Sequence, residues 1–223
     1  MAHLDDSLLQ AIDPIRPAVV VTTTVRAGIQ ALTSDRKQLW IATYDWTSGQ
    51  NSLQVLDPDS RTVHPITPLD GLVGTMMFDG QDLWLAFDNV VQKVDPATGA
   101  VSEPIAVGIY NNALAFADQH LWVATQLGTT TAGYVVKLVE QPTGEWLESD
   151  VGGNTPAALT PDGRRMWVAY KTGNVVQALD LISARHLITV PVGKAPRALA
   201  FDGKRVWIAN SEDGTVQAIY PTD

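Results

Sequence analysis

The sequence predicts an all-β protein assembled from a repeated four-stranded antiparallel unit, and three observations support this. A Trp-x-Ala motif recurs five times, at spacings of 38 to 45 residues. Apolar runs of strand length alternate with turn signals such as Asp-Gly, as expected for hairpins. No stretch has helical periodicity long enough to form a βαβ unit. The five motifs lie at residues 40–42, 84–86, 122–124, 167–169 and 207–209.

Each complete unit reads as strand A, a turn, strand B with the Trp, a hairpin, strand C, a turn and strand D. The turn position lies five residues before the Trp, at Asp35, Asp79, Ala117, Asp162 and Asp202. Strand C ends at residues 57–58, 95–96, 141–142, 180 and 220–221, and strand D closes on Gly71, Gly108, Gly152 and Gly193. Four short strands per repeat of about 40 residues are typical of a propeller blade. We expect each Trp to fill the space between adjacent blades.

The chain ends predict how such a ring closes. The last unit has strands at 198–201, 205–210 and 215–220 but no strand D, while an unassigned strand at 18–25 precedes the first strand A. Pairing residues 18–25 with 215–220 removes two exposed sheet edges. We therefore expect a five-bladed β-propeller closed by the N-terminal strand. Its blades span about 29–70, 71–107, 108–151, 152–192, and 193–223 together with 15–28, and residues 1–14 form a tail or a residual strand.

Residues 10–14 resemble residues 217–221, so the chain carries one more strand C than five blades can use. Two explanations stay open. The segment is a tail, since residues 6–11 also read as a short capped helix. Alternatively, the chain was cut from a longer repeat array or a larger protein.

The last repeat reads APRALAFDGKRVWIAN at 195–210, followed by DGTV at 213–216. This pattern resembles the YVTN and NHL class of propeller repeats, and the streptogramin B lyase superfamily looks related. The resemblance covers nearly the whole chain from residue 15 and implies a propeller fold, which hosts enzymes, sensors and scaffolds alike. The lyase resemblance also implies His and Glu catalysts with a bound metal, where the Trp strand commonly continues to Glu. Here that position holds Thr43, Phe87, Thr125, Tyr170 or Asn210.

Composition excludes several classes of function. The net charge is −9 and no run of Lys or Arg occurs, which argues against nucleic acid and anionic membranes as partners. No apolar stretch approaches the roughly 20 residues that cross a bilayer, and no signal peptide begins the sequence. The chain has no Cys and only four His, at positions 3, 64, 120 and 186 in separate elements. We therefore expect no catalytic residue, metal site or cofactor. Nothing indicates a compartment.

The face formed by the D–A and B–C loops is the expected binding surface, because loops on a rigid scaffold carry recognition. Equivalent positions before strand A differ in chemistry between repeats, which indicates either a composite pocket or an unconstrained channel mouth. Trp46 lies outside the Trp-x-Ala register in a polar loop, and it is either an exposed anchor or folded onto its own blade. The candidate binding residues are Gln30, Tyr44, Asp45, Trp46, Asp88, Tyr110, Asn112, Gln126, Lys171, Arg197 and Glu212.

The sequence leaves three hypotheses about function, each from a different class of protein. The favoured one is a non-catalytic docking module or scaffold, expected in a bacterial protein, for a protein, a peptide or a small polar ligand at the channel mouth. A sugar-binding lectin would present the same polar and aromatic set in every blade, which the differing positions do not. A lyase or hydrolase would need the converging His and Glu residues that the pattern lacks.

Overall fold

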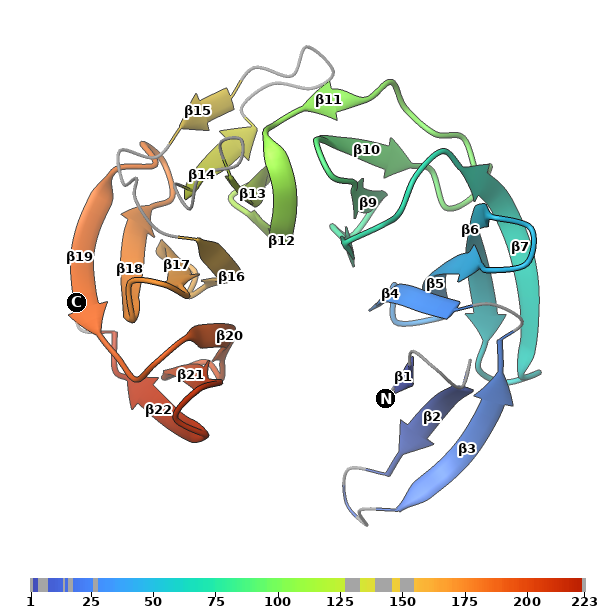
Figure 1. Cartoon of the computed structure of the whole chain (residues 1–223), viewed down its shortest axis with the longest axis horizontal. Coiled ribbons are helices and arrows are strands. Elements are labelled where there is room, and N and C mark those ends of the chain that lie inside the picture. The colour runs from blue at the N-terminus through green and yellow to red at the C-terminus, as the bar shows by residue number, and fades with distance from the viewer. Residues whose placement is uncertain are drawn as a thin grey trace. The chain divides into compact units, whose positions relative to one another are not determined.

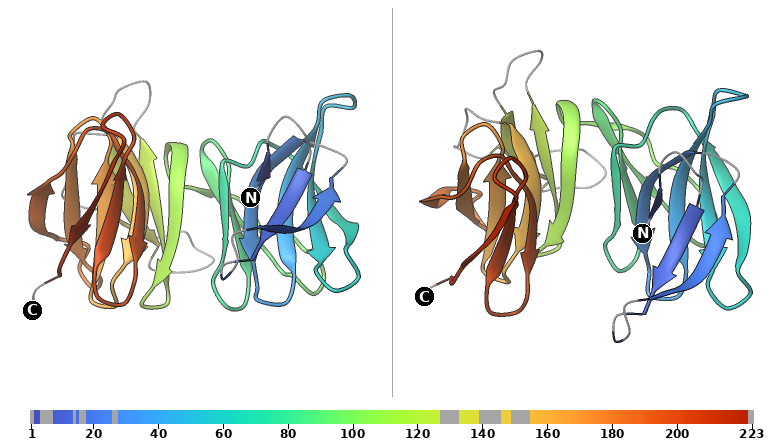
Figure 2. Two further views of the ribbon diagram at one scale, coloured as in Figure 1. Left: turned by 90° about the horizontal axis from the view of Figure 1, so that it is seen from below. Right: turned by 60° about the horizontal axis from the view of Figure 1, so that its bottom comes forward.

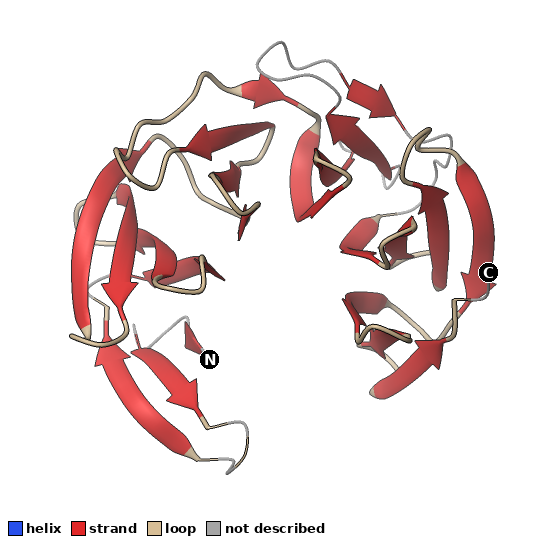
Figure 3. Ribbon diagram, turned by 180° about the vertical axis from the view of Figure 1, so that it is seen from behind, coloured by secondary structure: helices blue, strands red, loops and turns tan. Residues whose placement is uncertain are grey.

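The computed structural model describes residues 2–3, 8–13, 15, 18–25, 28–126, 133–138, 146–148 and 155–221. This part of the chain consists of strands, turns and loops, and no helix occurs in it (Figure 3). Every strand pairing is antiparallel within its sheet. The predicted all-β fold is confirmed. The turn at 141–142, Gly152 and the interior of the 126–133 loop lie outside the described residues.

Four of the sheets have four strands each, ordered A to D along the sequence (Figure 1). The first contains β4 (Gly28–Ser34), β5 (Leu39–Asp45), β6 (Gln50–Asp57) and β7 (Thr62–Leu69). The second contains β8 (Thr75–Phe78), β9 (Leu83–Ala86), β10 (Val90–Val94) and β11 (Ile105–Ala106). The third contains β12 (Ile109–Ala117), β13 (His120–Gln126), β14 (Gly133–Leu138) and β15 (Trp146–Glu148). The fourth contains β16 (Pro156–Pro161), β17 (Arg165–Tyr170), β18 (Val175–Asp180) and β19 (His186–Pro191).

Two further sheets have three strands. One contains β1 (Ala2–His3), β2 (Leu8–Ile12) and β3 (Val19–Thr24), and the other contains β20 (Pro196–Phe201), β21 (Val206–Asn210) and β22 (Thr215–Ile219). The chain forms two compact units, residues 1–87 with 92–103 and residues 88–91 with 104–223. Within each unit the hairpin turns lie at two opposite ends of the strands (Figure 2). The A–B turns therefore lie at the end of a sheet opposite to its B–C loops.

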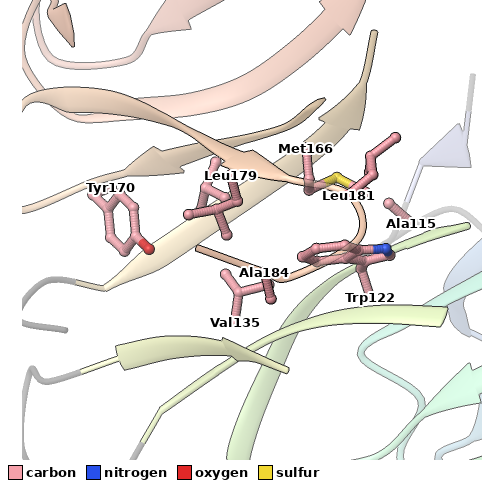
Figure 4. Packing of buried hydrophobic residues seen from close by; sticks show 9 residues of the cluster. Ala115, Trp122, Val135, Met166, Tyr170, Leu179, Leu181 and Ala184 are labelled. Carbon is pink, nitrogen blue, oxygen red and sulfur yellow. The ribbon is translucent and has the colours of Figure 1, made fainter. Parts of the chain in front are cut away.

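The Trp-x-Ala motifs form the cores, as the sequence predicts. Strand B buries both of its faces, because Trp122 and Ala124 point to one side and Val123 to the other. Trp122 packs against Met166 and Leu181 of the following sheet (Figure 4).

The next motif repeats this arrangement one sheet further along, where Trp167 packs in a cluster with Val206 and Ile208 of the last sheet. Trp40 and Trp84 are equally buried. Trp207 is only half-buried, because no further sheet follows it in the unit. Trp122 and Trp167 thus join their own sheet to the next, rather than filling a sheet's interior.

The five-residue spacing between the turn Asp and the Trp, which recurs in four of the five repeats, has a direct structural reason. In the second sheet, one carboxylate oxygen of Asp79 accepts the backbone N–H groups of Gln81 and Asp82 at 2.8 Å. The other oxygen accepts the indole N–H of Trp84 at 2.8 Å. The same indole bond joins Trp40 to Asp35, Trp167 to Asp162 and Trp207 to Asp202. The turn was expected at these positions, and the Asp oxygens that accept its N–H groups make it an Asx-turn; the bond to the indole was not expected.

The third A–B turn differs because Ala117 takes the place of Asp. Ala117 pairs directly with His120, which leaves Asp118 and Gln119 as a two-residue turn. Both central residues have positive φ, 49° and 61°. Two positive φ angles are typical of a type I′ hairpin, which closes a sheet without a side-chain acceptor.

The N-terminal segment forms a strand in the structure. Residues 8–12 form strand β2, not a capped helix, and they pair with β3 from Leu8↔Thr24 to Ile12↔Val19. Leu9 is buried in a cluster with Val25 and Ile29 of the same unit, which explains why the segment is a strand rather than a free tail. β3 and β22 are the terminal strands of their sheets. The expected pairing of 18–25 with 215–220, and with it the number of blades, stays a prediction.

Candidate functional site

Trp46 is the most exposed aromatic side chain among the described residues, with 78% of its surface accessible. The indole nevertheless has a defined position. It meets the Tyr44 ring edge-on, with ring centroids 4.5 Å apart and an interplanar angle of 86°. Its Nε1 lies over Gly28, where an added Cβ would come within 2.7 Å. Glycine at this position therefore makes room for the indole on the backbone at the start of β4.

The loop that carries Trp46 is held by Asp45. One carboxylate oxygen of Asp45 accepts the Thr47 N–H at 2.8 Å, and the other accepts the Ser48 hydroxyl at 2.8 Å. The backbone closes the loop with Gly49 N–H donating to the Asp45 carbonyl at 2.8 Å. The Ser48 hydroxyl and the Thr47 N–H hold the pKa of Asp45 below its ordinary value. Asp45 holds the loop that carries Trp46, and its predicted role as a binding residue stays a prediction.

Gln30 and Asn112 make hydrogen bonds between sheets. Gln30 Oε1 accepts the N–H of Val73, just before β8, at 3.1 Å. Asn112 Nδ2 donates to the carbonyl of Pro156 in β16 at 3.0 Å. Both therefore bond to the backbone just before or at the start of the following strand A. Sequence reasoning treated them as ligand donors and missed this bond, although the equivalent positions of the two residues were the available signal.

Arg197 lies on β20 beside a loop that side chains hold rigidly. Three consecutive N–H groups before β20 donate to side-chain oxygens: Gly193 to Gln217 at 2.7 Å, Lys194 to Asp213 at 2.5 Å and Ala195 to Asn174 at 2.9 Å. Arg197 itself is exposed and makes no ion pair with any residue that the structure describes. This places a solvated guanidinium next to a preorganised loop.

The remaining candidates belong to the second unit. Asp88, Tyr110 and Glu212 are exposed, whereas Gln126 and Lys171 are half-buried. Tyr110 has a positive φ of 57°, so its backbone is fixed in a conformation that few non-glycine residues adopt. Tyr44, Asp45 and Trp46 thus lie together at the end of β5 and in the loop after it, in the unit that also contains Gln30. The other seven candidates belong to the second unit.

The described histidines lie in separate elements. His64 lies on β7 and is hydrogen-bonded to Thr62, and His186 lies on β19 and is hydrogen-bonded to Thr189. His120 opens β13. No group of three or more His, Cys, Asp or Glu side chains suited to a metal ion occurs among the residues described. No membrane-spanning helix is found in that part of the chain either.

Comparison with known proteins identifies the fold. No protein-family model matches the sequence, and no curated protein matches it. The Pan2 WD40 domain of Neurospora crassa matches with a TM-score of 0.73 at 12% identity, over 98% of this chain and 71% of that one. Hsv2 of Kluyveromyces lactis matches with a TM-score of 0.69 at 13% identity, over 98% and 69%. Hydrazine synthase of Kuenenia stuttgartiensis matches with a TM-score of 0.55 at 12% identity, over 98% and 91%.

These likenesses show that the chain has a β-propeller-type fold, and its four-stranded sheets are blades. They do not single out the YVTN and NHL repeats, so that finer resemblance stays a prediction. A propeller presents its loops on a rigid scaffold.

Proposed function

We propose that this chain is a non-catalytic docking module that binds a protein or peptide partner through its D–A and B–C loops. The observation that carries the proposal is Trp46, which is exposed yet held in place by Tyr44, Gly28 and the Asp45 loop. Exposed aromatic residues with fixed positions are typical anchors of protein interfaces. Little conformational entropy is lost when such a residue meets its partner, because the side chain is already ordered.

Arg197 is the proposed polar contact of the second unit. Its guanidinium offers several donors for a carboxylate or a backbone carbonyl of the partner. The side-chain bonds to residues 193–195 fix the backbone just before it. Tyr44, Asp88, Tyr110 and Glu212 complete the proposed contacts of their respective units.

The experiment distinguishes whether binding needs only the indole of Trp46 or also its observed position. A partner is captured with the wild-type chain, identified and then measured by calorimetry against variants. Trp46→Ala should weaken binding by about 30-fold, as expected for a hot-spot aromatic residue. Gly28→Ala should weaken it as well, because the new Cβ displaces the indole. Arg197→Ala should weaken binding through the loss of a charged donor.

The matched control is Leu187→Ala, which removes an exposed apolar side chain from β19. It should leave both binding and melting temperature unchanged. Wild-type affinity in both Trp46→Ala and Gly28→Ala would reject the loop surface as the binding site.

A further inference from the structure

A groove runs across the A–B turns of the second unit, at the opposite end of the strands from the loops discussed above. Its larger part is a cavity of about 580 Å³ lined by Phe116 and Asp118 of the third sheet and by Pro161, Leu181 and Ile182 of the fourth. A smaller cavity of about 240 Å³ extends it to Phe201 and Lys204 of the last sheet. Arg164 lines both cavities, so the two form one surface over three successive turns.

The two halves of the groove differ in chemistry. The larger cavity has an apolar lining, and Ile182 at its edge leaves 76% of its side chain exposed. An exposed aliphatic residue beside a hollow is typical of a surface that receives another apolar side chain. The volume lies in the range of ordinary binding pockets.

The smaller cavity presents positive charge. Arg164 and Lys204 are exposed, whereas Arg165 forms an ion pair with Asp162 at 3.8 Å and its side chain is 18% exposed. Its acidic residue, Asp162, is only 4% exposed, because its oxygens face Trp167 and the N–H groups of Arg164 and Arg165. The carboxylate therefore points inward, while Arg164 and Lys204 lie at the surface. This is a local reversal of sign on a chain whose net charge is −9.

From this arrangement we infer that the turn groove binds an extended acidic peptide segment carrying aliphatic side chains. The carboxylates would pair with Arg164 and Lys204, and an aliphatic side chain would enter the cavity beside Ile182. Asp118, which is exposed at the far end of the larger cavity, would repel an acidic group there and so sets the direction of the peptide. A nucleic acid fits less well, since it has no aliphatic groups for the apolar half and is repelled by the overall negative charge.

The experiment measures fluorescence polarisation of a short labelled peptide of alternating Glu and Leu added to the whole chain. Three further probes are compared with it. Two are the same peptide with Lys in place of Glu or with Ser in place of Leu, and the third is an oligothymidylate. We expect the Glu/Leu peptide to bind most tightly, and binding to weaken as salt is raised. Arg164→Glu combined with Lys204→Glu should weaken it about tenfold or more. Ile182→Asp should weaken it through the apolar half.

The control is Lys37→Glu, which reverses the charge at the equivalent turn position of the first sheet. It should retain wild-type affinity, and circular dichroism checks that every variant is folded. The inference is overturned if the wild type does not bind the Glu/Leu peptide, if the Arg164 and Lys204 variant binds it equally well, or if the oligothymidylate binds as tightly. Because Trp46 is not part of this groove, either proposal can fail without the other.

Discussion

The bond between the turn aspartate and the buried tryptophan predicts a measurable coupling, best tested at Asp79 and Trp84. In Asp79→Ala, the Trp84 indole N–H loses its acceptor while its side chain stays 1% exposed. A buried donor without a partner costs about 1 to 3 kcal/mol. The two turn N–H groups also lose the Asp79 oxygen, but Gln81 is exposed and its N–H can bond to water. The free energy of unfolding should therefore fall by about 2 to 4 kcal/mol in total.

For a chain of this length, that loss lowers the melting temperature by roughly 5 to 15 °C. The assay is urea unfolding followed by circular dichroism, with tryptophan fluorescence as a second probe because the chain forms two compact units. Asp57→Ala is the matched control. Asp57 accepts the N–H groups of Asp59 and Ser60 in a similar turn but bonds to no indole, so its loss should cost only about 1 kcal/mol.

A double-mutant cycle isolates the indole bond. Trp84→Phe keeps most of the buried ring and removes the donor, so Asp79→Ala should be less harmful in that background by about 1 to 2 kcal/mol. Additivity of the two substitutions to within about 0.5 kcal/mol would show that the bond does not hold turn and core together.

Three further predictions follow from the same structure. Trp122→Ala should reduce the free energy of unfolding by about 3 to 5 kcal/mol, because it empties the space between two sheets; a loss under about 1 kcal/mol in urea titration would contradict that packing. The Trp207 indole and the Arg205 N–H hold the pKa of Asp202 well below its ordinary value. The ionised carboxylate therefore stabilises the fold above about pH 4, and this stability is lost as the pH falls further. Asp202→Asn should flatten that part of the profile of stability against pH, and an unchanged acid transition would exclude the role. The pairing of residues 18–25 with 215–220 predicts that Val20→Cys with Val216→Cys forms a disulfide under oxidation, in a chain with no cysteine of its own; failure to cross-link would reject the pairing.

Much of the fold could be predicted because it depends on local patterns. The Trp-x-Ala repeat marked strand B, and Asp residues such as Asp162 marked the A–B turn. Both signals act over a few residues of sequence. Two features of the sequence were signals of the indole bond. One is the fixed five-residue spacing from Asp to Trp, and the other is the single repeat in which Ala117 replaces the Asp.

Contacts between repeats were harder to predict. The strand at 8–12 depends on its pairing with β3 and on the burial of Leu9, which override a local pattern that also suits a helix. Gln30 and Asn112 look like free donors until the following sheet supplies their partners 43 and 44 residues away. The turn groove was missed for the same reason, because its lining comes from three different sheets. Trp46 was identified correctly as a residue outside the repeat, and its function stays a prediction.

The packing of Trp122 and Trp167 into the following sheet gives these repeats a direction and limits how far a disturbance spreads. When a repeat contacts only its neighbours, its contribution is the sum of its own stability and one interface on each side. A substitution in one motif should then loosen two sheets and leave the more distant ones intact. The same independence makes such chains tolerant of gaining or losing a whole repeat during evolution, since every junction is built in the same way.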